Sequence, residues 1–353
     1  MGKLIYLDNA ATTKTAPEVV EAMLPYFTEH FGNPSSVYSV GSSNKEVITK
    51  QRETIAKALG AKTEEIYFTA GGSESDNWAL KATAEAYGSK GKHIITTKIE
   101  HHAILHTGEY LEKHGYEVTY LDVDENGIVS PETVEAAIRP DTILISIMFA
   151  NNEIGTIAHK HGILFHTDAV QAFGQVPINV DEMNIDMLSS SGHKLNGPKG
   201  IGFLYIRKGV KIRSFVHGGA QERKRRAGTE NVPAIAGLGE AAEEIYENLD
   251  EKRAHLYGLK QRFIDGIEKL EGTHVNGKTG EDSAPHIVSV SFEGIRSEVL
   301  LHSLEDRGIY VSSGSACSSN NHAGKQKGSK TLRNIHLKEN LLDSTLRFSF
   351  SVH

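Results

Sequence analysis

The sequence predicts an α/β fold whose central sheet is largely parallel and covered by helices on both faces. Short, continuous apolar runs rich in Ile, Leu and Phe recur through the middle of the chain, as expected of strands buried on both sides. Amphipathic helical stretches alternate with these runs. The chain has 353 residues, enough for one large domain with a substantial core and a smaller second domain.

The large domain is expected to contain seven strands. They are predicted at Glu65–Thr69, His93–Thr97, Glu117–Leu121, Ile143–Phe149, Ile163–Thr167, Met187–Ser190 and Gly202–Ile206. A helix is expected at Ser73–Tyr87 after a Gly-Gly turn, and another at Pro131–Ile138, where proline occupies the first helical position without losing a hydrogen bond. Residues 233–270 are helical and charged in pattern, which suits a connection out of the large domain.

The last part of the chain predicts a smaller α+β domain. Its expected strands and helix are Ile287–Phe292, Ile309–Ser312, Leu346–Phe350 and Ser297–Asp306. The N-terminal strand is expected to join this domain. We therefore predict a large domain over residues 13–248 and a small domain made of residues 1–12 and 249–353.

Composition excludes several classes of function. The formal net charge of −7 gives no electrostatic reason to expect a nucleic acid or an anionic membrane as partner. No apolar run approaches the roughly 20 residues of a membrane-spanning helix, and the first acid, Asp8, comes too early for a signal peptide. A single cysteine excludes an internal disulfide or a multi-cysteine metal site. A cytoplasmic location is the natural expectation.

Lys194 follows an apolar strand and is preceded by Ser191 and His193. A lysine at a strand end suits Schiff-base chemistry when its amine is partly desolvated or lies near other positive charge. Ser191 and His193 could hold a phosphate group beside it. The alternative is a solvated loop lysine, which describes most lysines.

Asp168 ends another predicted strand, at the sheet edge where α/β proteins bind ligands. A buried carboxylate needs a partner, and the protonated ring nitrogen of pyridoxal phosphate is one. Capping of a following helix is an equally good interpretation. The turn Gly71–Gly72–Ser73 places backbone N–H groups and a hydroxyl at a helix start, which suits a phosphate. It matches neither a P-loop nor a dinucleotide fingerprint.

His101 and Cys317 complete the candidates. His101 could stack on a planar ring, move a proton, or be a structural histidine. It could also ligate metal with His166 and Asp168, but no helical H-E-x-x-H spacing is present, so no metal is expected. Cys317 lies in a polar Ser-, Gly- and Asn-containing stretch, which favours an exposed nucleophilic thiol over the buried position usual for a lone cysteine.

In order along the chain, these motifs closely resemble the cysteine desulfurases of the class V aminotransferase family. The shared motifs are Tyr6–Thr13, Phe31–Ser36, Gly71–Ser75, Asn151–Gly155, His166–Ala169, His193–Lys194, Arg226–Asn231 and Leu346–Ser349. The resemblance covers nearly the whole chain. It implies a pyridoxal 5'-phosphate enzyme of fold type I, with a mostly parallel seven-stranded sheet in the large domain and the cysteine loop in the small one.

The resemblance also implies roles for individual residues. Lys194 would form the Schiff base and shuttle the Cα proton, Asp168 would hold the ring nitrogen, and His101 would stack on the ring. The phosphate would be bound by Gly72, Ser73, Ser191 and His193, and Thr229 would be supplied by the partner subunit of a homodimer. Gln171 and Asn152 would contact the ring oxygen or the substrate. Arg347 and Asn33 would bind the substrate carboxylate, and Cys317 would accept the sulfur.

The implied reaction converts L-cysteine to L-alanine and leaves a persulfide on Cys317. The sulfur would pass to an acceptor protein, such as an iron–sulfur scaffold or a tRNA-thiolation enzyme, for cluster assembly or the synthesis of other sulfur-containing cofactors and thio-nucleosides. A selenocysteine lyase or another class V aminotransferase is the alternative. A non-catalytic scaffold is less favoured because it would need neither Lys194 nor Asp168, and a zinc hydrolase is the least favoured.

The sequence departs from the family pattern in two places. Between Ile157 and Ala158 it lacks about one short helix that relatives carry, and it ends at His353, where relatives usually continue with a further helix. The first gap lies close to Asn152 and weakens the role inferred for that residue.

Overall fold

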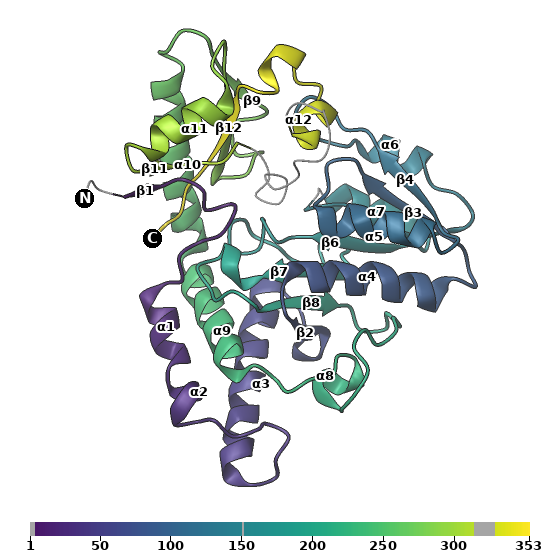
Figure 1. The fold of residues 1–353 in the computed structure, drawn as a ribbon. Coiled ribbons are helices and arrows are strands. Elements are labelled where there is room, and N and C mark those ends of the chain that lie inside the picture. The colour runs from purple at the N-terminus through teal and green to yellow at the C-terminus, as the bar shows by residue number, and fades with distance from the viewer. Residues whose placement is uncertain (1–3, 150–151, 314–328) are drawn as a thin grey trace. The chain divides into compact units, whose positions relative to one another are not determined.

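The computed structural model describes residues 4–149, 152–313 and 329–353. Contacts divide the chain into two compact units (Figure 1). The large unit comprises residues 14–121 and 130–247, and the small unit comprises residues 1–13, 122–129 and 248–353. Residues 122–129 come from the middle of the chain and group with the terminal segments. The domain boundaries expected from the sequence stay a prediction.

A seven-stranded sheet forms the centre of the large unit. Its strands are β2 (Ile66–Thr69), β3 (His93–Thr97), β4 (Glu117–Leu121), β5 (Thr142–Ser146), β6 (Leu164–Asp168), β7 (Met187–Ser191) and β8 (Gly202–Ile206). Their order is β2-β8-β7-β6-β5-β3-β4, and only β8 runs antiparallel to its neighbours. The predicted α/β class with a mostly parallel sheet is confirmed.

Helices connect and cover these strands. In the large unit they are α1 (Pro17–Met23), α2 (Pro25–Thr28), α3 (Ser39–Leu59), α4 (Gly72–Tyr87), α5 (His102–Glu112), α6 (Pro131–Ala136), α7 (Asn152–Lys160), α8 (Gln221–Lys224) and α9 (Val232–Glu247), with 3-10 turns η1 (Thr63–Glu65) and η2 (Gly192–Lys194). α4 packs against α5 and against β5, β7 and β8, whereas α1 and α3 pack against α9. Of the described helices, none is long and apolar enough to cross a membrane.

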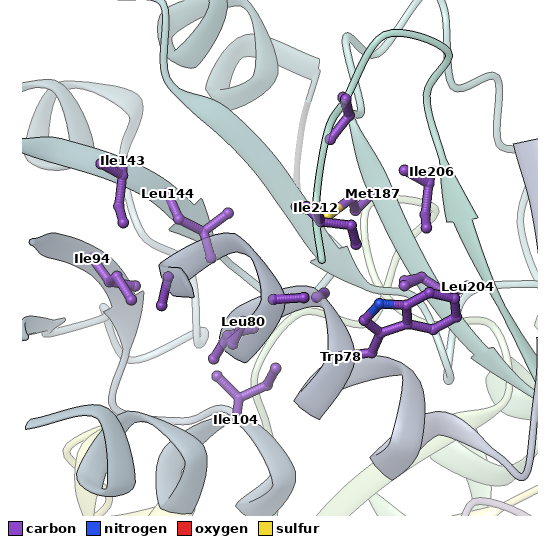
Figure 2. Packing of buried hydrophobic residues seen from close by; sticks show 14 of the residues in the cluster. Trp78, Leu80, Ile94, Ile104, Ile143, Leu144, Met187, Leu204, Ile206 and Ile212 are labelled. Carbon is purple, nitrogen blue, oxygen red and sulfur yellow. The ribbon is translucent and has the colours of Figure 1, made fainter. Parts of the chain in front are cut away.

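The main core lies between α4, α5 and the sheet (Figure 2). Trp78 of α4 is fully buried and shares this core with side chains of β2, β3, β5, β7 and β8, and its indole N–H donates to the carbonyl oxygen of Arg213 at 2.9 Å. Every residue of β2, β3, β5, β7 and β8 is buried. The strand ends that carry the candidate residues therefore belong to a rigid, closely packed framework.

The small unit contains two sheets and its own core. Its elements are β1 (Ile5–Tyr6), α10 (Leu249–Ile267), β9 (Thr273–Asn276), β10 (Ile287–Phe292), α11 (Ser297–Glu305), β11 (Ile309–Tyr310), α12 (Lys330–Asn334), η3 (Glu339–Leu341) and β12 (Thr345–Ser349). The order β12-β10-β9 is antiparallel, and β1 pairs with β11 in parallel. The N-terminal strand thus joins this unit, as expected from the sequence.

Most differences from the predicted elements are at their ends. The strand expected to continue to Phe149 ends at Ser146, and the long helical region is two helices separated at Asn248, whose backbone is not helical. The sequence analysis missed α3, which ends at Gly60 with the left-handed φ of 67° that glycine adopts readily. Its apolar residues are spread among many lysines and serines, so the helical period is weak.

Candidate active site

Asp168 lies at the carboxyl end of β6, directly opposite Ser189 of β7. Its Oδ1 accepts a hydrogen bond from the backbone N–H of Val170 at 3.0 Å. Residues 170–175 form turns instead of the helix that Asp168 was alternatively expected to cap. Loss of hydration raises the pKa of Asp168, while the Val170 N–H and the charge of Lys194 act in the opposite direction. A further cationic partner would therefore stabilise the ionised form of this carboxyl group.

Lys194 ends the 3-10 turn that follows β7 and is half-buried. Its positive charge acts on both Asp168 and His101, and it contributes to lowering the pKa of His101. The structure thus brings together the three residues that the sequence analysis expected around the cofactor ring. A fully solvated loop position, the alternative considered for this lysine, does not describe it.

His101 is the N-cap of α5, so its ring is held at the start of the helix. Nδ1 accepts a hydrogen bond from the backbone N–H of Ala103 at 3.2 Å, which leaves Nε2 to carry the hydrogen of the neutral ring. Loss of hydration, followed by the charges of Lys194 and His106, lowers its pKa. At neutral pH the ring is uncharged, which suits stacking on another planar ring.

The turn between β2 and α4 lies against Val170, which follows β6, and against Ser191, the last residue of β7. Gly71 has a φ of 148°, and a Cβ on Gly72 would lie 2.6 Å from Cγ2 of Val170. A Cβ on Gly71 would lie 3.5 Å from Oγ of Ser191. The N-terminus of α4, with exposed Ser73, therefore lies beside the hydroxyl of Ser191. Backbone N–H groups and hydroxyls at a helix start form a suitable phosphate site.

His193 stands next to Lys194, and loss of hydration together with the charges of Lys194 and Lys199 lowers its pKa to about 4. The imidazole is therefore neutral at physiological pH and can act as a hydrogen-bond donor to a phosphate, not as a cation.

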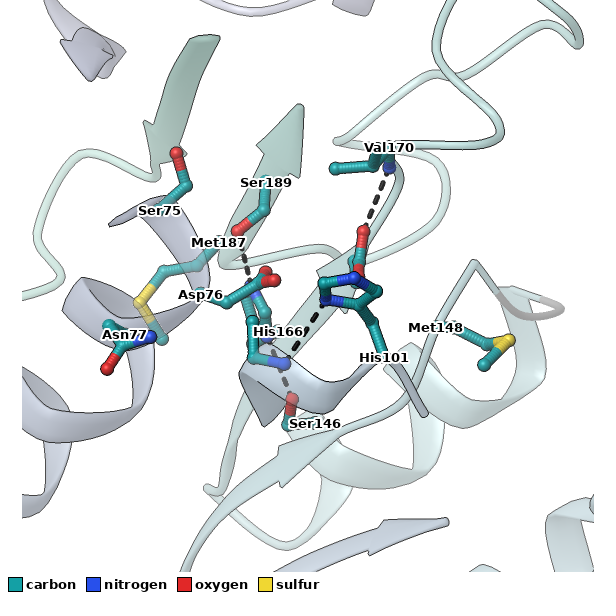
Figure 3. Close-up of polar contacts among 12 residues, drawn as sticks. Ser75, Asp76, Asn77, His101, Ser146, Met148, His166, Val170, Met187 and Ser189 are labelled. Atoms are coloured by element: carbon teal, nitrogen blue, oxygen red, sulfur yellow. Dashed lines mark hydrogen bonds and ion pairs between the residues drawn. The ribbon is translucent and has the colours of Figure 1, made fainter. Parts of the chain in front are cut away.

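A buried polar network behind these residues was not recognised from the sequence (Figure 3). His166 of β6 is fully buried, and its Nδ1 and Nε2 lie 2.9 Å from the hydroxyls of Ser146 and Ser189. Burial lowers the pKa of His166 to about 3, so the ring is neutral. Asp76 of α4 has Oδ1 at 3.8 Å from Nε2 of His166. Asp76 could have been suspected because it falls on the buried face of α4, between Ser75 and Ala79.

Glu100 belongs to the same region. It accepts hydrogen bonds from Thr97 Oγ1 at 2.7 Å and from the backbone N–H of Met148 at 3.0 Å. Burial nevertheless raises its pKa to about 8. Neither Asp76 nor Glu100 was assigned a role by the sequence analysis.

The other candidate residues of the large unit are Gln171, Asn33, Thr229 and Asn152. Gln171 is exposed, in the turn that follows Asp168, and exposed Asn33 accepts a hydrogen bond from the backbone N–H of Ser35. Thr229 is exposed near Arg226, which pairs with Glu74 of α4 at 2.7 Å. Asn152 begins α7, but its side chain lies outside the described part of the structure.

Arg347 lies on β12 in the small unit, where its Nη2 donates to Oδ1 of Asp8 at 2.8 Å. The two side chains are 22% and 20% exposed. The backbone N–H of Arg347 donates to the carbonyl oxygen of Ser312 at 2.7 Å. Cys317 itself lies outside the described residues.

Comparisons with known proteins agree with the motifs. A family model described as Aminotransferase class-V matches residues 5–353. Cysteine desulfurase IscS of Methanosarcina thermophila is 58% identical over 326 residues, covering 90% of this chain and 80% of that protein. Cysteine desulfurase IscS of Dictyoglomus turgidum is 47% identical over 363 residues, covering 100% of this chain and 91% of that protein.

Solved structures show the same likeness. A NifS-like protein superimposes with a TM-score of 0.91 at 38% identity, over 99% of this chain and 94% of that one. The structure named "SspA in complex with cysteine" superimposes with a TM-score of 0.86 at 36% identity, over 98% of this chain and 99% of that one. The resemblance inferred from the motifs is confirmed: the chain belongs to the class-V aminotransferase family.

Proposed function

We propose that this protein is a cysteine desulfurase that uses pyridoxal 5'-phosphate. The observation that carries the proposal is the meeting of Lys194, Asp168 and His101 at adjoining ends of the sheet, with ligating atoms of His101 and Asp168 within 4.8 Å of one another. The relatives named cysteine desulfurase point to the substrate.

The described residues fit this cofactor. The carboxylate of Asp168 has a raised pKa, and a protonated ring nitrogen would supply the positive partner that it needs. The N-terminus of α4, Ser73, Ser191 and His193 would hold the phosphate, and Lys194 would hold the cofactor through its ε-amine. When bound, pyridoxal phosphate supplies an electron sink for charge that develops at the substrate Cα.

The protein's own groups would orient the reactants and move protons. His101, neutral and fixed by its hydrogen bond to Ala103, would lie against the ring. The ε-amine of half-buried Lys194 would take the Cα proton and return it. Gln171 and Asn152 would contact the ring oxygen or the neighbouring substrate.

Arg347 and Asn33 would bind the substrate carboxylate, and a planar guanidinium suits a bidentate contact with it. The carboxylate would compete with Asp8 for Arg347. The Cys317 thiolate would then attack the sulfur of cysteine, and the bond between that sulfur and Cβ would break. Its electron pair would stay with the carbon fragment, which takes up a proton and leaves as alanine, while a persulfide remains on the protein. This step rests on the sequence and on the family.

The wider assignments are also proposals. The protein would form a homodimer in which Thr229 of the partner subunit completes the phosphate site, and the two domains would be residues 13–248 and residues 1–12 with 249–353. A cytoplasmic location suits a catalytic thiol in a chain with one cysteine. The acceptor would be a sulfur-binding protein, such as an iron–sulfur scaffold or a tRNA-thiolation enzyme.

The experiment that tests the proposed function measures alanine formed from L-cysteine with a reductant present. We expect the wild-type protein to be yellow and to form alanine and sulfide in equal amounts, and Lys194→Ala to be colourless and inactive. Lys199→Ala, an exposed lysine of the same loop, is the matched control and should keep its colour. A wild-type protein that cannot take up pyridoxal phosphate would contradict the proposal. Alanine formation from selenocysteine but not from cysteine would favour a selenocysteine lyase.

A further inference from the structure

We propose that Asp76 is a positioning residue that remains uncharged, so that Asp168 alone presents a negative charge to the cofactor. Asp76 would carry the proton of a carboxyl pair that holds one charge instead of two. The effect on cofactor binding rests on the proposed function. The protonation state of Asp76, by contrast, can be measured on this chain alone.

Asp76 is almost completely buried. It lies on α4, the helix that starts at the proposed phosphate site, and is 1% exposed. Among the described residues, neither Oδ1 nor Oδ2 has a hydrogen-bond partner. An ionised carboxylate in such a position costs several kcal/mol, whereas a protonated one costs much less.

The groups around Asp76 do not supply a compensating cation. Oxygen atoms of Asp76 and Asp168 and a ring nitrogen of His101 all lie within 4.8 Å of one another, and Nε2 of His166 lies 3.8 Å from Oδ1 of Asp76 (Figure 3). Both histidines have lowered pKa values and are neutral at pH 7. The remaining charged neighbours, Asp168 and Glu100, are acids that disfavour a second negative charge.

The two carboxyl groups of the pair are not equivalent. Asp168 accepts the Val170 N–H and experiences the positive charge of Lys194, and both favour its ionised form. Asp76 has neither. The nearby Ser189 hydroxyl favours its ionised form, but its burial, followed by the charge of Asp168, outweighs this effect and raises its pKa well above the usual range. When two acids share a site, the proton stays on the one whose charge is less stabilised. That acid is Asp76.

This assignment gives Asp76 a specific effect on the cofactor. With one charge, the pair balances one protonated ring nitrogen, and the charge stays on the carboxylate that ends β6. Asparagine has the shape of a protonated aspartate and is always neutral. Asp76→Asn should therefore preserve the affinity for pyridoxal phosphate within about threefold, whereas Asp168→Asn should weaken it strongly.

The infrared difference spectrum between the wild type and Asp76→Asn, recorded on the full chain with and without pyridoxal phosphate, tests the proposal directly. At neutral pH we expect the wild type to show the carbonyl stretch of a protonated carboxylic acid that Asp76→Asn lacks. Glu100→Gln is the matched control, because it should remove a different band and leave this one. If Asp76→Asn does not fold, carbon-13 labelling of the aspartate carboxyl groups in the wild type and in Asp168→Asn assigns the band without it.

The pH dependence of unfolding gives a second test. A folded-state pKa above the unfolded value of about 4 means that the folded wild type binds an extra proton, so its stability falls as pH rises above 4. Relative to Asp76→Asn, the unfolding constant of the wild type should rise by up to tenfold per pH unit until Asp76 ionises.

These measurements separate the two proposals. Failure of the wild type to take up pyridoxal phosphate would contradict the proposed function, while the infrared band of the cofactor-free chain would still decide the state of Asp76. Asp76, His101 and Asp168 could also coordinate a divalent cation, which would keep Asp76 ionised. A band that is missing from the wild type, or one that emerges only after a chelator is added, would overturn the proposal. So would an Asp76→Asn protein that loses the cofactor as severely as Asp168→Asn.

Discussion

Two acidic sites, one in each unit of the molecule, are stabilised differently. In the small unit, Asp8 forms an ion pair with Arg347, and both side chains keep about a fifth of their surface exposed. In the large unit, Asp76 and Asp168 lie close together, and Asp168 accepts a hydrogen bond from the Val170 N–H. Asp8 thus contacts a charged guanidinium, whereas Asp76 and Asp168 lie beside another acid.

The difference indicates how each unit would treat its ligand. A cation that reaches Asp168 adds an interaction that was missing, so binding of a protonated ring nitrogen is favoured without breaking a contact. A substrate carboxylate that reaches Arg347 must replace Asp8, so only the difference between the two contacts favours binding. Exposed ion pairs contribute about 0.2–1 kcal/mol, and this modest strength makes such an exchange easy.

Replacement of Asp168 should have the largest effect. We expect Asp168→Asn to reduce the affinity for pyridoxal phosphate and the rate of alanine formation by about 30-fold or more, because the loss of one partner of a buried charge pair costs about 2–5 kcal/mol. Cofactor titration by absorbance measures this. Asp186→Asn is the control, since Asp186 is also buried but pairs with His159. Equal loss of cofactor affinity in both variants would contradict a specific role for Asp168.

Glu100 tests whether burial or hydrogen bonding decides the charge state in the large unit. Its pKa of about 8 exceeds the unfolded value of about 4, so the folded chain holds an extra proton between these pH values. The unfolding free energy of the wild type, relative to that of Glu100→Gln, should therefore fall by up to about 1.4 kcal/mol per pH unit from pH 4 to 8. Denaturant unfolding at several pH values measures it, and a difference independent of pH would mean that the hydrogen bonds keep Glu100 ionised.

Arg347 tests the ligand exchange in the small unit. Arg347→Lys keeps the positive charge but removes the planar guanidinium group, which can donate two parallel hydrogen bonds to a carboxylate. The KM for cysteine should therefore rise about tenfold while cofactor affinity stays unchanged. Steady-state kinetics and cofactor titration separate these effects. Arg296→Lys, at an exposed site of the same unit, should change neither quantity. A loss of cofactor affinity without a change in KM would remove Arg347 from substrate binding.

The smallest effect is expected at Asp8. Asp8→Asn frees Arg347 from a competing carboxylate, so the KM for cysteine should fall, by at most about fivefold, which corresponds to an exposed ion pair of about 1 kcal/mol. The same kinetic assay measures this change. A higher KM would show instead that Asp8 holds Arg347 in its binding orientation.

Much of the fold was predictable because the strands of the large unit are short apolar runs with clear ends. The ends at β3, β4 and β8 agree to the residue. The ends at β6 and β7 agree to within one residue, and they place Asp168 and Lys194 at the correct sheet edge. The helix α3 was not predictable, because its buried face includes Asn44, Gln51 and Arg52, which hide the apolar period. The protonation state of the site could not be predicted either. It depends on the proximity of Asp76 and Asp168, which are 92 residues apart in the sequence.

The most direct test of the account is the mass of the intact protein after reaction with L-cysteine in the absence of reductant. Cys317 is the only cysteine, so a persulfide can form at one position only. We predict that the wild type gains one sulfur atom that a reductant removes, that Cys317→Ser gains none but stays yellow, and that Lys194→Ala gains none and is colourless. A Cys317→Ser protein that releases sulfide at the wild-type rate would contradict the account.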